Sequence, residues 1–312
     1  MLKDKLKFQW VDTLKTIGIL AVILGHIASP FGQFIFSWHM PLFFVVSGFF
    51  IKFNLSFSDF FIKDFKRLMV PYFIFSFVGL GAEFLKRLLL HREELNLLVE
   101  MKGILFHMDM SSLSNHYGFV LWFLPTLFFS RLFLFLIQKI THNVFYGLIV
   151  VVLLFVISFY VDLPFALDNA LNSVIWVYIG FVYFNYYQQN KILYLLPILG
   201  ALVLLFFGLP VLNMADKIYS NEVLVIVWAL SVIYTFILIL KNIPDSSYFN
   251  QWGKYTMLLF VFHPYTNNAA HIIVERIHPN AWYLSFGISL LLLYMLILIK
   301  KKVGNKGLFK YV

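Results

Sequence analysis

The chain consists of long apolar runs of about 20 residues, separated by short segments that hold charged or turn-forming residues. Runs of this length predict helices that cross a membrane. Ten such spans are expected, at 10–29, 35–52, 68–90, 119–140, 144–161, 168–187, 192–212, 223–240, 253–274 and 281–299. No internal repeat, linker or second domain is visible. The pattern therefore predicts an all-α, polytopic integral membrane protein with about ten transmembrane helices, forming one domain over residues 1–312.

Composition and charge agree with this class. Of the 312 residues, 61% are hydrophobic and only 12% are charged, which is more apolar surface than a soluble core can hide. The net charge of +9 comes from basic residues that flank the spans, so it predicts topology rather than nucleic-acid binding. Both termini are expected in the cytoplasm, because 17 of the 24 Lys and Arg residues, including Lys3, Lys5 and Lys7, then lie inside. The expected location is the cell membrane, as a multi-pass protein.

The first span carries three ionisable residues, which are costly in lipid and indicate a functional site. On a helix, Lys15 and His26 differ by about 20° in direction and lie about 16 Å apart along the axis. Asp12 falls within about 40° of the same line. This face suits a long, thin ligand with an anionic head. The alternative is an interfacial pair of Asp12 with Lys15 and a structural hydrogen bond from His26.

Other spans add further candidate residues. Arg67 ends an amphipathic stretch over 53–67, whose basic face suits an anionic cofactor or lipid headgroups. Arg131 lies in the fourth span, where it either reaches the interface or faces a polar cavity. His263 precedes Pro264, which should kink the helix and free a carbonyl beside the histidine.

The chemistry of these residues favours acid–base catalysis. A buried imidazole without a metal-ligand partner at i+3 or i+4 suits a general base, and no hydrolase, phosphate-loop or paired-carboxylate motif competes. The absence of cysteine excludes disulfides and thiolate chemistry. If the ligand were acyl-coenzyme A, then Lys15, Arg67 and Arg131 would hold its phosphates at the cytoplasmic mouth. The thioester would then reach His26, where a sugar hydroxyl could arrive from outside. Ser47 could relay the acyl group, although direct transfer is simpler.

A series of short motifs extends from residue 10 to about 265. They are Lys15 with His26, Ser37-Trp38-His39-Met40-Pro41, Ser47-Gly48-Phe49, Lys66-Arg67-Leu68 with Pro71-Tyr72, Leu121-Trp122-Phe123-Leu124-Pro125, and Gly253-Lys254 leading to Phe262-His263. In this order they resemble the membrane-bound acyltransferase type 3 family, and most of all its fucose 4-O-acetylase-like branch. The resemblance implies about ten helices, an acyl-CoA donor and, usually, a surface glycan as acceptor. It also implies that His26 is the catalytic base and that Lys15, where many members have Arg, binds the donor.

We therefore expect an O-acetyltransferase that moves acetyl from acetyl-CoA to a cell-surface or lipid-linked glycan, such as an exopolysaccharide or capsule, without a metal. The catalytic candidates are His26 and Asp12, and the donor-binding candidates are Lys15, Arg67 and Arg131. The substrate-binding candidates are His39, His263 and Trp122, although a structural hydrogen bond is an equal alternative for the two histidines. Two other functions stay open: transfer of succinyl or another acyl group, and transport of a glycan or metabolite, since ten spans with buried polar residues also describe carriers.

Overall fold

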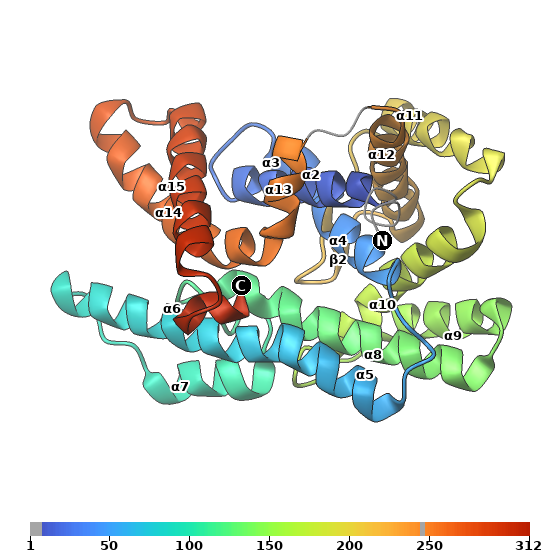
Figure 1. Cartoon of the computed structure of the whole chain (residues 1–312), viewed down its shortest axis with the longest axis horizontal. Helices are drawn as coiled ribbons and strands as arrows, with labels where there is room; N and C mark the ends of the chain where they lie inside the picture. The colour runs from blue at the N-terminus through green and yellow to red at the C-terminus, as the bar shows by residue number, and fades with distance from the viewer. Residues whose placement is uncertain (1–7, 244–246) are drawn as a thin grey trace.

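The computed structural model describes residues 8–243 and 247–312, and this part of the chain is almost entirely helical (Figure 1). The α-helices are α2 (Gln9–Gly25), α3 (Gly32–Phe36), α4 (His39–Gly48), α5 (Phe57–Asp64), α6 (Val70–Leu89), α7 (Leu97–Lys102), α8 (Phe123–Thr141), α9 (Val144–Ile157), α10 (Leu167–Val182), α11 (Leu195–Phe207), α12 (Glu222–Asn242), α13 (Ser247–Lys254), α14 (Thr256–Ile277) and α15 (Trp282–Val303). The π-helical turns are η1 (Phe65–Met69), η2 (Gly103–His107) and η4 (Tyr183–Tyr187), and the 3-10 turns are η3 (Phe119–Trp122), η5 (Lys191–Tyr194) and η6 (Gly307–Tyr311).

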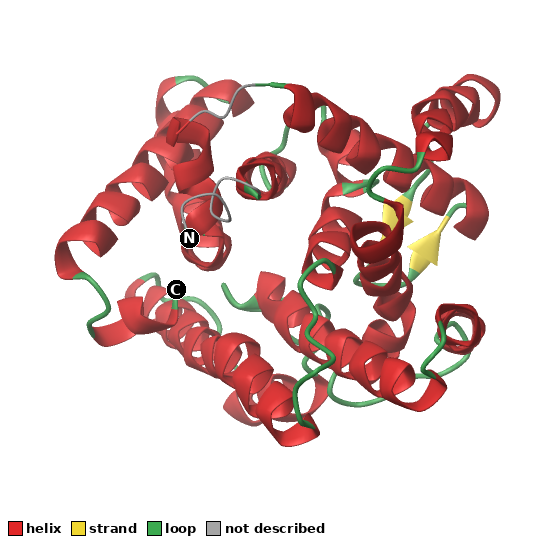
Figure 2. Ribbon diagram, turned by 45° about the vertical axis from the view of Figure 1, so that its right-hand side comes forward, coloured by secondary structure: helices red, strands yellow, loops and turns green. Residues whose placement is uncertain are grey.

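The prediction of an all-α protein is confirmed. The strands among the described residues are β1 (Leu212–Asn213) and β2 (Ile218–Tyr219), which form one small antiparallel hairpin (Figure 2). Within the part of the chain that the structure describes, four helical segments are long and apolar enough to cross a membrane: Phe57–Leu89, Phe119–Thr141, Glu222–Asn242 and Trp282–Val303. The count of about ten spans and the cytoplasmic termini stay predictions. Lys3, Lys5 and Lys7, which contributed to the predicted orientation, lie outside the described residues.

Each predicted span falls on helix, but several boundaries differ. The first helix ends at Gly25, one residue before His26. The second span is divided into α3 and α4, with Pro41 in the first turn of α4, where its missing N–H costs nothing. The predicted amphipathic stretch and the third span are joined, because the π turn η1 links α5 directly to α6.

The helices form two groups, which Figure 1 shows as an upper and a lower row. α2 packs against α13, α14 and α12 in the upper row, while α10 packs against α8 and α9 in the lower row. α4 links the groups because it contacts both α2 and α10. Three of the cavities described below lie around α4 or α2.

Two glycines in the sequence motifs permit close contact between helices. A Cβ added at Gly48 would lie 2.1 Å from the carbonyl oxygen of Val177 in α10. A Cβ added at Gly253 would lie 2.0 Å from the carbonyl oxygen of Asp12 in α2. Both positions therefore require glycine, as at other close crossings of membrane helices, and they fix α4 and α13 against the neighbours that carry site residues.

Candidate active site

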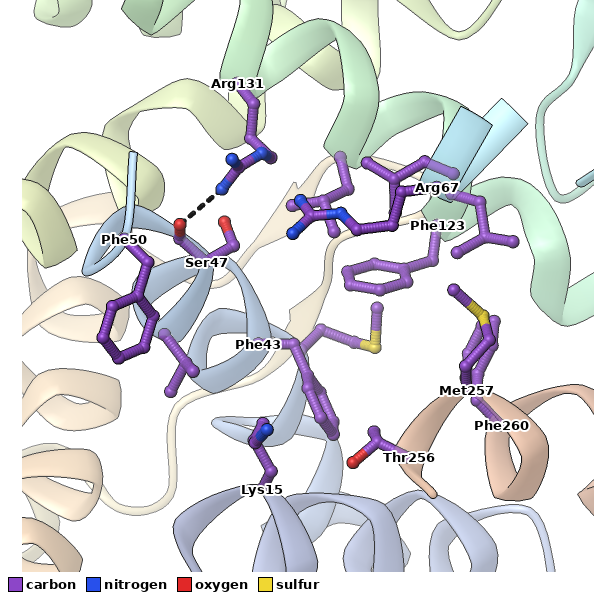
Figure 3. Close-up of a pocket in the computed structure, with 15 residues that line it drawn as sticks. Lys15, Phe43, Ser47, Phe50, Arg67, Phe123, Arg131, Thr256, Met257 and Phe260 are labelled. Carbon is purple, nitrogen blue, oxygen red and sulfur yellow. Dashed lines mark hydrogen bonds between the residues drawn. The ribbon is translucent and has the colours of Figure 1, made fainter. Parts of the chain in front are cut away.

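A cavity of about 300 Å³, here called the basic cavity, brings together the three predicted donor-binding residues. Lys15 comes from α2, Arg67 from η1 and Arg131 from α8. Figure 3 shows Lys15 on one side of the cavity and the two guanidinium groups on the other. Most of the remaining lining is apolar, and includes Phe43 and Phe123. The cavity thus combines an apolar wall with three cations from separate elements.

A buried carboxylate, Asp64, holds the two arginines. The Nε of Arg131 donates to Asp64 Oδ2 at 2.6 Å, and Arg67 Nη2 lies 3.3 Å from Asp64 Oδ1. Arg131 also donates from Nη1 to the carbonyl oxygen of Ser47, at 2.5 Å (Figure 3). Arg131 is therefore fixed in position, whereas the Arg67 side chain, although paired with Asp64, is half exposed and accessible to a ligand. Sequence reasoning missed Asp64, although its position three residues before Arg67 on an otherwise basic face was a usable signal.

Asp12 lies with Lys15 and not with His26. Lys15 Nζ is 2.6 Å from Asp12 Oδ1, so the alternative prediction of an ion pair at i, i+3 describes this contact. His26 is fourteen residues further along α2, which corresponds to about 21 Å of helix. The structure therefore gives Asp12 contact with the donor-side lysine and no contact with the imidazole.

Ser47 also lines the basic cavity, but its hydroxyl is engaged. Its Oγ donates to the carbonyl oxygen of Phe44 at 2.8 Å, within the same helix. Neither His26 nor another histidine lines this cavity. A serine nucleophile needs an adjacent base, so the arrangement favours direct transfer over a Ser47 relay.

His26 lies just beyond the C-terminal end of α2, among aromatic rings. Its ring centroid is 5.2 Å from that of His263, 5.7 Å from that of Phe36 and 5.5 Å from that of Phe119. Phe36 also packs against His39, with centroids 5.2 Å apart. Three histidines from α2, α4 and α14 are thus brought to one place, although they are far apart in the sequence.

Hydrogen bonds to backbone carbonyls fix the tautomers of two of these histidines. Nδ1 of His39 lies 2.8 Å from the carbonyl oxygen of Ile35, and Nδ1 of His263 lies 2.7 Å from that of Phe260. A carbonyl only accepts, so each Nδ1 carries the proton and each Nε2 of the neutral ring is an acceptor. Pro264 lacks the N–H that would otherwise reach the Phe260 carbonyl. The predicted free carbonyl is therefore present, and α14 continues through Pro264 to Ile277.

The Nε2 atom of His263 is buried and has no hydrogen-bond partner among the described residues. Buried polar atoms are normally paired. The His263 ring lies beside that of His26, and a hydrogen-bond donor that reached Nε2 would satisfy this acceptor. His39 and His263 both lie near His26, and substrate binding by either of them stays a prediction.

Two further cavities meet at His26. One of about 380 Å³, the histidine cavity, is lined by His26, His39 and Trp122. The other, of about 420 Å³, is the amide cavity, lined by His26 together with Asn267 and Asn268. Met40 lines both the basic cavity and the histidine cavity. The three cations therefore line a cavity that adjoins the one lined by His26 and His39, and Met40 contributes to the lining of both.

The amino-acid sequence matches a known protein family. The sequence model of a family described as an acyltransferase domain matches residues 8–300, which is nearly the whole chain. The chain belongs to the acyltransferase 3 family. No curated protein and no solved structure matches it. Membership in the family makes the chain a membrane acyltransferase. Within the described residues, no group of three His, Asp or Glu side chains is placed to hold a metal ion.

Proposed function

We propose that this chain is an integral membrane O-acetyltransferase of the fucose 4-O-acetylase-like branch, which moves acetyl from cytoplasmic acetyl-CoA to a hydroxyl of a cell-surface or lipid-linked glycan. The observation that carries this proposal is the arrangement around Met40. A cavity lined by three cations adjoins a cavity lined by His26 and His39, and Lys15 precedes His26 by eleven residues, about 16 Å of helix. A donor with an anionic head and a thioester end matches this separation.

In this proposal the phosphates of acetyl-CoA bind Lys15, Arg67 and Arg131. Asp64 holds Arg131 in place, and Asp12 positions Lys15. The basic cavity, at about 300 Å³, is at the small end of ligand pockets, so it suits the slender pantetheine arm, and the nucleotide lies outside it. The thioester then passes Met40 and reaches the histidines.

His26 acts as the general base. It takes the proton of the acceptor hydroxyl while the oxygen attacks the thioester carbonyl carbon. The C–S bond then breaks, and the protonated imidazole returns the proton to the coenzyme A sulfur. His263 Nε2 accepts a hydrogen bond beside His26, and His39 with Trp122 lines the space that the acceptor enters. Protonated His26 is thereby stabilised at the moment when it carries charge.

Acetyl is favoured over succinyl by the lining near His26. A succinyl group carries a free carboxylate, which a buried site would have to neutralise. Among the described residues, those lining the histidine and amide cavities include no Lys or Arg. An uncharged acyl group fits such a site better.

The test is transfer of labelled acetyl from acetyl-CoA to the glycan fraction in inside-out vesicles. His26→Ala should reduce the label by about 100-fold or more, the usual contribution of a general base. His278→Ala is the matched control, because His278 is exposed and lines none of the cavities described above. Equal label in His26→Ala and the native protein would return His26 to a structural role. Transport of a glycan without any acylated product would favour the carrier function.

A further inference from the structure

A fourth cavity, of about 430 Å³, lies outside the residues assigned above. Three stretches of the chain form it, one of which includes the first turn of α10, and we call it the outer polar cavity. Its lining residues are His107, Asp109, Ser111 and Ser112, then Asp162, Asp168 and Asn169, then Ala215, Asp216 and Lys217. Unlike the other cavities it is lined mainly by polar side chains.

The lining of this cavity is strongly acidic. It holds four carboxylates and one ammonium group, so its formal charge is −3 with His107 neutral. The ammonium is already engaged: Lys217 Nζ donates to the carbonyl oxygens of Ser158 and Val161, at 3.2 and 3.1 Å, and pairs with Asp168. Burial opposes ionisation of Asp109, but hydrogen bonds from Ser112 and Ser111 outweigh it and lower the pKa of that carboxyl. Asp109 therefore carries its negative charge at neutral pH.

Asn169 gives the cavity an unsatisfied acceptor. Its side chain is 2% exposed, and its Nδ2 donates to the carbonyl oxygen of Ala215 at 3.1 Å. Its Oδ1 is buried without a hydrogen-bond partner among the described residues. Leaving such a group unpaired is unfavourable. A ligand that donates hydrogen bonds would remove this cost, and no group of ligands in the described chain has a metal-binding arrangement.

The outer polar cavity adjoins the histidine cavity. Ala215, in the turn of the β1–β2 hairpin, lines both cavities. This turn lies between the remaining lining residues of the two cavities. A chain-like molecule with one unit at His26 would therefore place its next unit against Asn169 and the carboxylates.

We propose that the outer polar cavity is an acceptor subsite for a sugar unit that is rich in hydroxyl groups and carries no negative charge, next to the unit acylated at His26. This inference rests on the proposed function, because it takes the acceptor to be a glycan. Sugar hydroxyls donate to Asn169 Oδ1 and to the aspartates, and an amino group adds attraction. Units with a carboxylate or a phosphate are repelled by the same aspartates.

The experiment measures binding of three trisaccharides to the full chain in lipid nanodiscs, without acetyl-CoA. The probes are triacetylchitotriose, which is neutral, chitotriose, which carries amino groups, and trigalacturonate, which is anionic. The native protein should bind the first two at least about tenfold more tightly than the third. Asn169→Leu should weaken binding of triacetylchitotriose about tenfold, as expected for one lost hydrogen bond to a buried group.

The double variant Asp162→Asn with Asp216→Asn should reduce the difference in affinity between chitotriose and trigalacturonate. Glu222→Gln is the control, because it removes an exposed carboxylate outside this cavity and should change nothing. Equal binding of all three probes, or an unchanged affinity in Asn169→Leu, would overturn the proposal. Tight Ca²⁺ or Mn²⁺ binding that is lost in the double variant would also overturn it, in favour of an ion site.

A separate measurement keeps this result apart from the proposed function. Acetyl transfer to a monosaccharide acceptor needs only the histidine cavity, so Asn169→Leu should leave its rate unchanged. Transfer to the matching trisaccharide should fall about tenfold, mainly through KM. Loss of both activities to the same extent would show a general structural defect and contradict the subsite.

Discussion

At the scale of single residues, Pro264 determines how His263 is presented to its surroundings. Because proline cannot donate to the Phe260 carbonyl, that oxygen accepts from His263 Nδ1. The imidazole is thereby held with Nε2 as an acceptor beside His26. Nδ1 of His39 likewise donates to a backbone carbonyl, that of Ile35 in α3. Two histidines are therefore oriented by backbone carbonyls and not by the substrate.

This orientation predicts the effect of His263→Asn. The asparagine amide can still donate to the Phe260 carbonyl, but it offers no acceptor at the position of Nε2. We expect a folded protein whose acetyl transfer falls about tenfold or more, through kcat. Initial rates with acetyl-CoA and glycan test this. A fall in thermal stability without the predicted fall in kcat would mean that His263 acts in packing alone.

Substitutions of Lys15 and His26 should affect different steps: Lys15 donor binding, and His26 the transfer reaction. Lys15→Ala removes a cation from the basic cavity, so acetyl-CoA binding should weaken by about three- to tenfold. His26→Ala should leave donor binding within about twofold and abolish transfer. Titration of the purified protein with acetyl-CoA measures donor binding. Lys63→Ala is the control, because Lys63 lies at an exposed position outside the basic cavity. Equal loss of acetyl-CoA binding in Lys15→Ala and His26→Ala would contradict the assignment of donor binding to Lys15 and of transfer to His26.

At the scale of helices, the crossing of α4 with α10 holds Ser47 and the arginine network in place. The crossing depends on Gly48, whose added Cβ would meet the Val177 carbonyl oxygen. Gly48→Ala should therefore destabilise the protein by about 1–3 kcal/mol, the usual cost of overpacking. Gly81→Ala, where nothing lies within 4 Å of the new Cβ, is the matched control in α6. Thermal unfolding in detergent distinguishes the two, and equal stability would contradict the described crossing.

Residues 108–118, which precede η3, are expected to lose stability in acid. His116 Nδ1 accepts from the Gly118 N–H at 2.9 Å, and its Nε2 is 3.9 Å from Glu100 Oε2. Burial lowers the pKa of His116, although Glu100 and Glu83 oppose this effect. The unfolded segment therefore binds a proton more readily than the folded one. The stability contribution is full above about pH 6.5 and is lost as the pH falls below it.

Hydrogen exchange of residues 108–118 measures this effect. After correction for intrinsic rates, protection in the native protein should fall between about pH 7.5 and pH 5. His116→Asn keeps an acceptor for Gly118 without titrating in this range, so its protection should stay constant. A pH response of the same size in both proteins would contradict the assignment to His116.

Hydropathy placed each predicted span on helix, but it did not predict the short helix α7 between the third and fourth spans. It did not locate the break between α3 and α4, the π turn η1 or the β1–β2 hairpin, because these depend on contacts with other segments. In the candidate site, the face shared by Lys15 and His26 followed from helix periodicity. The proximity of His26 to His263 and the link between Asp64 and Arg131 join residues far apart in the chain, and no local pattern specifies them.

At the scale of the whole molecule, the cavities adjoin one another in a series. The basic cavity and the histidine cavity share Met40, and the histidine cavity shares His26 with the amide cavity and Ala215 with the outer polar cavity. In the proposed function, donor and acceptor would therefore approach His26 from different directions. With the predicted cytoplasmic termini, the donor would enter from the cytoplasm and the acceptor from outside.

The measurement that tests this account most directly uses the purified chain in sealed, uniformly oriented proteoliposomes. Labelled acetyl-CoA is enclosed or added outside, and a membrane-impermeant glycan is placed in the opposite or the same compartment. We predict transfer only when acetyl-CoA is on the side of the basic cavity and the glycan is on the other, and no transfer in His26→Ala under any arrangement. Efficient transfer with both molecules on one side, or transfer that survives in His26→Ala, would contradict the account.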